Sequence, residues 1–289
     1  MIRIFVVHNN EQERLRYLLP KLRDLLDGLN QAGKAASLEL VGPDADLIRQ
    51  NQYRDSFVNK IRRGMDASSM SFFYAFDKPG LSSPAKELVR GCRRSFDYLF
   101  RHRRSVRIEQ EVLYAHAHCW RKSSESKMPA LVLESDAVLR PFTKHGLLAL
   151  LDHIESNSWQ GEKYYVDLAG GCDRGAIFNS WCFESEYGCR NDDLQVTPEI
   201  RTHLLPRLTA NTVGGYLVSA ALASELFSSV MTQKPVLPPD WAIMAFAASS
   251  ESVRSSLCLH TTPTLFTQGS SSGEYVSGID PLPRSSRAM

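Results

Sequence analysis

The sequence contains no long apolar run, no C-x-x-C pair and no strong excess of charge of either sign. A membrane-spanning helix needs about 20 predominantly apolar residues, so we expect a protein that is soluble or that rests on a membrane surface. The six cysteines have neither disulfide-scaffold density nor zinc-ligand spacing, which predicts reduced thiols in the cytoplasm. The net charge of +2 gives no reason to expect a nucleic-acid partner.

The chain begins with a pattern typical of a parallel sheet. Residues 2–7 form a short apolar run, which predicts a central strand rather than a signal peptide. Leucines at helical spacing over residues 11–31 predict a helix that Pro20 should kink or split. Residues 37–41 predict a second strand, and a β-α-β start implies a right-handed crossover. No G-x-G-x-x-G follows the first strand, which disfavours a dinucleotide fold.

Helical and strand patterns continue to alternate along the chain. We predict further helices over residues 87–104, 108–123, 147–154, 220–231 and 242–248. Further strands are predicted over residues 129–133, 164–168 and 256–260 and after the glycine pair within residues 209–219. Residues 50–86 and 172–190 show no clear period, and the Ser/Gly/Pro-rich residues 276–289 predict a disordered tail. This order predicts a single α/β domain with a mostly parallel central sheet flanked by helices.

One predicted helix, residues 87–104, carries several arginines on the face opposite its apolar residues. Such a helix could contact anionic lipid or bind a phosphorylated glycan. A charged face that merely meets solvent explains the pattern equally well.

The stretch LVLESDAVL, residues 131–139, places acids at the end of a buried strand. Glu134 and Asp136 would project into the crevice where open α/β sheets bind ligands. A hard divalent cation takes one or two such carboxylates and fills its other positions with diphosphate oxygens and water. Solvated acids at a strand end are the alternative explanation.

Other positions also admit a structural and a functional interpretation. Gly214 and Gly215 permit close backbone approach to a ligand, or form a plain bulge. Asp240 stands at a predicted helix N-cap, and capping alone would explain an aspartate there. His116 has either a substrate-contact or supporting role, or is a buried histidine whose hydrogen bonds are satisfied.

Several of these residues resemble a known family. Glu109, His116 and Trp120, followed by ALVLESDAVL, are similar to the gE…SH…W…ALILEDDv core of glycosyltransferase family 25, which includes bacterial lipooligosaccharide galactosyltransferases. Residues 212–221 resemble its T.gY.iS..aA segment. Ser135 departs from the family, which usually has an acid at that position.

Two shorter matches extend the resemblance toward the chain ends. Pro239-Asp240 lies where the family has P-V-D, and Arg14 follows the first strand as in the family's opening eR sequence.

The resemblance implies a GT-A-like domain with a Rossmann-like sheet over residues 1–275. Residues 1–140 would form the nucleotide-sugar half and residues 141–275 the acceptor half. The implied enzyme is an inverting, metal-assisted hexosyltransferase that moves galactose, or another hexose, from a nucleotide diphosphate sugar such as a UDP-sugar. The acceptor would be an oligosaccharide or glycolipid of lipopolysaccharide, lipooligosaccharide or capsule. The protein would be cytoplasmic or peripheral on the inner face of the membrane, with a possible contact through residues 87–104.

The resemblance also implies site residues. Glu134, Asp136 and His260 would hold Mn²⁺ or Mg²⁺, and Asp240 would be the general base. The nucleotide sugar would contact His8, Asn9, Arg14, Glu109, His116, Gly214 and Gly215.

Two other function classes remain open from the residues. A nucleotidyltransferase or metal-dependent phosphohydrolase could use the same acidic pair without an acceptor sugar. A degenerate protein that binds a nucleotide sugar or glycan without chemistry is favoured by Ser135.

Overall fold

The structure is a computed structural model that describes residues 1–8, 12–42, 106–157, 159–170, 194–195, 200–205, 208–210 and 213–269. The predictions for Asn9 and for residues 50–86, 87–104, 172–190 and 276–289 lie outside the described residues.

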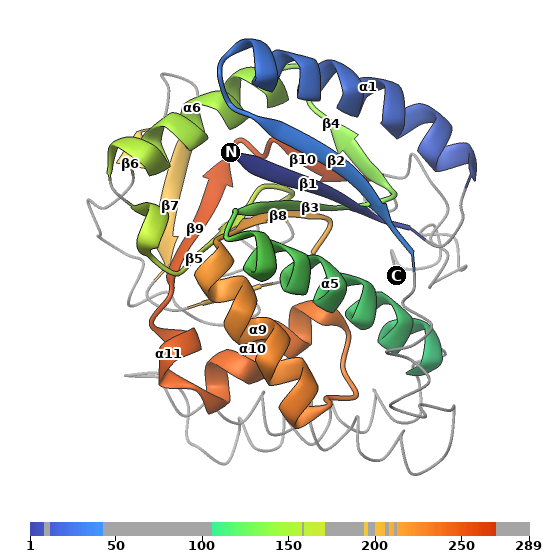
Figure 1. The fold of residues 1–289 in the computed structure, drawn as a ribbon, viewed down its shortest axis with the longest axis vertical. Coiled ribbons are helices and arrows are strands. Elements are labelled where there is room, and N and C mark those ends of the chain that lie inside the picture. Colours follow the sequence, from blue (N-terminus) through green and yellow to red (C-terminus); the bar gives the residue numbers. More distant parts are fainter. Residues whose placement is uncertain are drawn as a thin grey trace, which may run out of the picture.

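The described part of the chain contains an eight-stranded mixed sheet in the order β2-β1-β3-β8-β5-β9-β7-β6 (Figure 1). Its strands are β1 (Ile2–Val7), β2 (Ala36–Val41), β3 (Ala130–Glu134), β5 (Tyr164–Asp167), β6 (Leu194–Gln195), β7 (Arg201–Leu205), β8 (Gly215–Val218) and β9 (Leu257–Thr262). The β1–β2 pair is parallel, as the β-α-β pattern predicts, and so are β1–β3 and β5–β9.

The prediction of a mostly parallel sheet is wrong. Strand β8 runs antiparallel to both β3 and β5, and β7 runs antiparallel to β9 and β6. All four residues of β8 are buried. A short apolar run indicates burial on both faces but carries no information about strand direction, so the sequence pattern could not reveal this insertion.

Helices cover both faces of the sheet (Figure 1). On one face lie α1 (Gln12–Gln31) and α6 (Thr143–Ser156), and on the other lie α5 (Val106–Ser126), α9 (Ala220–Gln233) and α10 (Pro239–Ser249). The short helices η1 (Trp159–Gly161) and α11 (Glu251–Arg254) complete the described helical elements. Among all these helices, none is both long and apolar enough to cross a membrane.

Helix α1 continues through Pro20 and is not split. Proline within a helix costs about 3 kcal/mol because it removes one hydrogen bond and crowds the preceding turn. Pro20 itself is exposed. The opposite side of α1 buries five leucines at positions 15, 18, 22, 25 and 29. Since each buried leucine contributes about 1.5–3 kcal/mol, packing against the sheet outweighs the proline.

The predicted strand that ends in the acidic residues is present as β3. Strand β3 ends at Glu134, a turn follows at Ser135 and Asp136, and β4 (Ala137–Leu139) then pairs with β10 (Phe266–Gln268) in a separate antiparallel sheet. The acidic turn therefore connects two sheets.

Two cysteines, Cys119 and Cys258, lie in the described part, and both are buried free thiols. Burial raises the pKa of Cys258 to about 12, which keeps it protonated and unreactive at neutral pH.

Candidate functional site

Strand register places a row of polar side chains on one face of the sheet. Tyr216 pairs with Val132 on one side and with Asp167 on the other, and Asp167 pairs with His260. Directly paired residues share a face, and so do residues two apart on one strand, which adds Glu134 to the row. The row lies near the carboxyl ends of β3, β5 and β9 and faces α5, since its apolar neighbours pack with that helix.

Helix α5 brings His116 and Trp120 against Tyr216. Trp120 Nε1 donates a hydrogen bond to Tyr216 Oη at 2.9 Å, and His116 Nδ1 lies 2.8 Å from the same oxygen. The rings of His116 and Tyr216 stack at 5.8 Å. All three side chains are fully buried. Burial raises the pKa of Tyr216 well above its usual range, so its hydroxyl stays protonated.

Glu134 lies at the open end of this cluster. Its Oε2 accepts a hydrogen bond from Gln268 Nε2 at 3.1 Å, and its Oε1 lies 3.7 Å from His116 Nε2. Its side chain is 23% exposed, so it is accessible to solvent, unlike His116, Trp120 and Tyr216. Asp136, only 4% exposed, follows one residue later, and its carbonyl accepts the N–H of Gly269 at 2.8 Å. The two acids are therefore held within the same connection between the two sheets.

His260 and Asp167 form a separate buried pair. His260 Nδ1 lies 3.6 Å from Asp167 Oδ2, and His260 Nε2 donates to the carbonyl of Thr209 at 3.2 Å. Asp167 Oδ1 accepts the N–H groups of Ala169 and Gly170, both at 2.9 Å. Burial raises the pKa of Asp167, and the charge of His260 and the two amides oppose part of that rise.

The predicted metal ligands do not all come together. His260 on β9 is three strand spacings from Glu134 on β3, which is about 14 Å, and its side chain contacts Asp167 instead. Within the described ranges, no group of three or more His, Cys, Asp or Glu side chains is arranged to hold a metal ion. Glu134 and Asp136 are the predicted ligands that the structure keeps near each other.

The two predicted sugar-contacting glycines are packed against protein atoms. A Cβ on Gly215 would lie 3.1 Å from Leu133 Cδ2, and one on Gly214 would lie 3.3 Å from Gln268 Cβ. Leu133 belongs to the core, and Gln268 is the residue that holds Glu134. Close packing is thus a sufficient physical reason for glycine at both positions.

Asp240 is the second residue of α10 and not its N-cap. The N-cap is Pro238, which has no side chain to accept a hydrogen bond, and Pro239 is the first helical residue. The prediction of Asp240 as a cap is therefore wrong by two positions, because proline at the start of a helix shifted the boundary. Asp240 is half-buried in the first turn, where a carboxylate is favoured by the helix dipole.

The start of α5 is tied to the segment that precedes α10. Gln110 Nε2 donates to the carbonyl of Pro235 at 2.9 Å. Since α5 leads through a short turn into β3 and runs against it, its first residues lie beyond the carboxyl end of that strand. Glu109, 2% exposed, is next to Gln110. Glu109 and the start of α10 therefore lie at the same end of the sheet as Glu134.

His8 and Arg14 lie at the carboxyl end of β1. His8 follows β1, and its N–H bonds to the carbonyl of Val41 at 3.0 Å. Arg14 is in the first turn of α1, which covers the other face of the sheet from α5. Both side chains are half-buried. They lie at the same end of the sheet as Glu134 but on the opposite face of the sheet.

Sequence reasoning assigned no role to Tyr216 or Gln268, the two residues that connect the cluster. Tyr216 belongs to the segment GGYLVS that resembles the family, so the segment could have indicated it. No sequence signal pointed to Gln268, which reaches Glu134 from 134 positions further along the chain.

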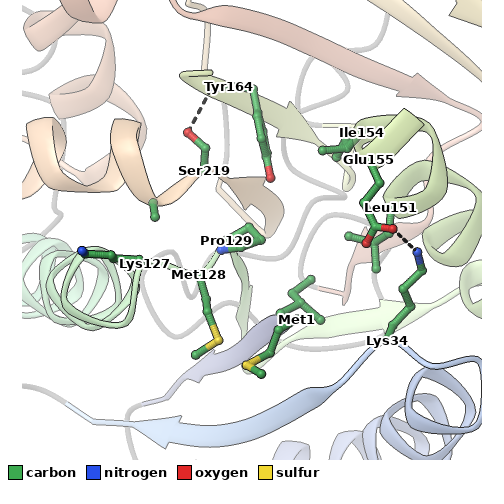
Figure 2. Close-up of a pocket in the computed structure, with 12 residues that line it drawn as sticks. Met1, Lys34, Lys127, Met128, Pro129, Leu151, Ile154, Glu155, Tyr164 and Ser219 are labelled. Atoms are coloured by element: carbon green, nitrogen blue, oxygen red, sulfur yellow. Dashed lines mark hydrogen bonds and ion pairs between the residues drawn. The ribbon is translucent and has the colours of Figure 1, made fainter. Parts of the chain in front are cut away.

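A cavity of about 250 Å³ lies at the opposite edge of the sheet (Figure 2). Tyr164 points its hydroxyl toward Pro129, and Leu151 lies beside Glu155. Lys34 Nζ donates a hydrogen bond to Glu155 Oε2 at 2.7 Å. These residues lie near the amino ends of β2, β3 and β5 or on α6. None of the predicted site residues lines this cavity.

The comparisons with known proteins add no support to the family resemblance. No protein-family model matches the chain, and no match was found among curated proteins.

Proposed function

We propose that this protein is a metal-assisted glycosyltransferase of GT-A-like fold, which transfers a hexose, galactose first, from a nucleotide diphosphate sugar to a glycan acceptor. One observation carries the proposal. Three separate stretches that resemble glycosyltransferase family 25 contribute the side chains of one buried cluster: His116 and Trp120 from the first, Glu134 from the second and Tyr216 from the third. Residues that are about a hundred positions apart thus meet where an α/β sheet binds ligands.

The acidic pair fits a hard divalent cation such as Mn²⁺ or Mg²⁺. Glu134 and Asp136 offer only oxygen acceptors when ionised, and Glu134 is partly exposed to solvent. When bound, the cation neutralises charge on the leaving diphosphate. The hydrogen bond from Gln268 holds one carboxylate oxygen of Glu134 in place.

Asp240 is the proposed general base. The acceptor hydroxyl attacks the anomeric carbon, its proton passes to the Asp240 carboxylate, and the bond from that carbon to the diphosphate oxygen breaks on the opposite side. Inversion at the anomeric carbon follows from this single displacement. The half-buried position of Asp240 in the first turn of α10 supports the role, because the acceptor hydroxyl must be able to reach the base.

The proposed acceptor is an oligosaccharide or glycolipid of lipopolysaccharide, lipooligosaccharide or capsule. The proposed location is the cytoplasm or the inner face of the membrane. Both rest on the family resemblance.

A transfer assay with Mn²⁺, UDP-galactose and an oligosaccharide acceptor tests the proposal. We expect acceptor-dependent release of UDP, and Asp136→Asn should reduce it by orders of magnitude because the change removes the charge with little change in volume. Asp152→Asn is the matched control, since this carboxylate is 67% exposed on α6 and away from the site.

Other outcomes of the same assay contradict transfer. Hydrolysis of the nucleotide sugar at full rate without acceptor would favour a phosphohydrolase or nucleotidyltransferase. Metal-dependent binding of nucleotide sugars without turnover would favour a degenerate binding protein, as Ser135 suggests.

A further inference from the structure

His116 has one ring nitrogen that lacks a hydrogen bond. The side chain is completely buried, and its Nε2 has no hydrogen-bond partner within the described residues. Leaving a buried polar group unpaired costs about 1–3 kcal/mol. The carboxylate of Glu134 is close to this nitrogen, with its Oε1 3.7 Å away, just beyond hydrogen-bond length. An exception of this kind requires a physical explanation.

The two hydrogen bonds at Tyr216 Oη determine which His116 nitrogen carries the proton. An indole N–H can only donate, so Tyr216 Oη accepts from Trp120. In the described part of the chain, His116 Nδ1 is the only remaining acceptor at that hydroxyl, so the phenolic proton points to Nδ1. A neutral imidazole whose Nδ1 accepts must carry its proton on Nε2. The Nε2 proton therefore points at Glu134.

The alternative tautomer is unfavourable. If Nδ1 carried the proton, Tyr216 Oη would face two donors, and its own proton would be buried without an acceptor. Burial holds the pKa of Tyr216 well above its usual range, so loss of that proton offers no relief. In the Nε2 tautomer the Tyr216 proton has an acceptor and the Nε2 proton lies near the Glu134 carboxylate, at an N···O distance of 3.7 Å, so this tautomer is favoured.

We propose that His116 is a positioning residue for Glu134. The hydrogen-bonded chain from Trp120 through Tyr216 fixes the imidazole so that its Nε2 proton faces one carboxylate oxygen, while Gln268 holds the other. The two carboxylate oxygens thus meet donors from two different elements, α5 and β10. Gly214 takes part indirectly, because a Cβ there would lie 3.3 Å from Gln268 Cβ and displace it.

The positioning of Glu134 toward a cation rests on the proposed function, whereas the tautomer of His116 is independent of that function. Two measurements separate these points. The first is the His116 tautomer, measured by long-range ¹H–¹⁵N correlation on the ¹⁵N-labelled full chain at about pH 8, where most imidazoles are neutral. Loss of a signal in His116→Gln assigns the residue. His118, whose Nδ1 lies 3.1 Å from the Arg121 guanidinium, is the internal control.

We expect His116 to be protonated on Nε2, and Tyr216→Phe should shift it toward the Nδ1-protonated form while the His118 signal is unchanged. A wild-type His116 that carries its proton on Nδ1 would overturn the proposal without any variant being made.

The second measurement is Mn²⁺ affinity by calorimetry. Residues that orient a ligand of a metal typically change affinity by about 10- to 100-fold when removed, which we expect for His116→Leu. Gln places an amide donor near the Nε2 position and Asn places one near Nδ1, so His116→Gln should retain affinity and His116→Asn should not. Equal loss in both variants would contradict positioning through Nε2. A wild-type protein that binds no Mn²⁺ contradicts the metal-assisted function. In that case the measured tautomer of His116 still tests whether its Nε2 proton faces Glu134.

Discussion

Replacing His260 with leucine should leave a negative charge buried inside the sheet. Leucine has a volume similar to that of histidine, so the change removes polarity with little loss of packing. Asp167, 1% exposed, would keep the N–H groups of Ala169 and Gly170 on one oxygen but lose the imidazole facing the other. The carbonyl of Thr209 would also lose its donor.

Removing one partner of a buried charged pair costs about 3–5 kcal/mol, and we expect a loss in this range at neutral pH. Asp167→Asn should cost less than about 1 kcal/mol, because the asparagine oxygen still accepts both amides and its NH₂ group can donate to His260 Nδ1. In the double variant the charge is absent, so Asp167→Asn should recover about 2 kcal/mol of stability in the His260→Leu background. This is the difference between the cost of an unpaired buried charge and that of an unpaired buried amide.

The loss should depend on pH in a defined direction. Burial raises the pKa of Asp167 in the folded state, so the folded protein binds its proton more readily than the unfolded chain. The contribution of Asp167 to stability is therefore fully present below its unfolded pKa of about 3.9 and is lost as pH rises through the folded pKa. Without His260 to oppose the rise, the folded pKa should move further up. The penalty of His260→Leu should thus shrink as pH falls from neutral toward 5.

Urea unfolding followed by circular dichroism at several pH values measures these differences. The order of stability at neutral pH should be wild type, close to Asp167→Asn, then the double variant, then His260→Leu. A double variant no more stable than His260→Leu, or a His260→Leu penalty that does not change with pH, would refute the assignment of a buried carboxylate paired with His260.

Three further predictions concern the site and the sheet. Asp240→Asn should change stability by at most about 1 kcal/mol, the size of a helix-dipole interaction, while removing most of kcat; a near wild-type turnover number would place the base elsewhere. Glu134→Gln should weaken Mn²⁺ binding less than Asp136→Asn does, because ligation by Glu134 can run through a water molecule, and calorimetry compares the two. Gly215→Ala should lower the free energy of unfolding by about 1–3 kcal/mol, since its Cβ would lie 3.1 Å from Leu133, whereas Gly161→Ala, which meets nothing within 4 Å, is the control.

Local sequence patterns determined where most elements lie. The strand over residues 2–7 and the helices over residues 108–123 and 220–231 are present in the structure with ends that differ by at most three residues. These elements have a clear period, and both period and length depend only on neighbouring residues. The acidic strand end at Glu134 was visible for the same reason.

Beyond the first β-α-β unit, tertiary structure decided which strands are neighbours in the sheet. The alternating or apolar pattern of a strand shows which faces are buried, but the antiparallel position of β8 between β3 and β5 depends on how the whole chain packs. Pro20 shows the same limit, because packing of α1 on the sheet overrides a local helix breaker. Polar contacts depend most on this arrangement. His116 meets Tyr216 across 100 positions and Glu134 meets Gln268 across 134, and hydrogen bonds between such distant residues leave no periodic signal in the sequence.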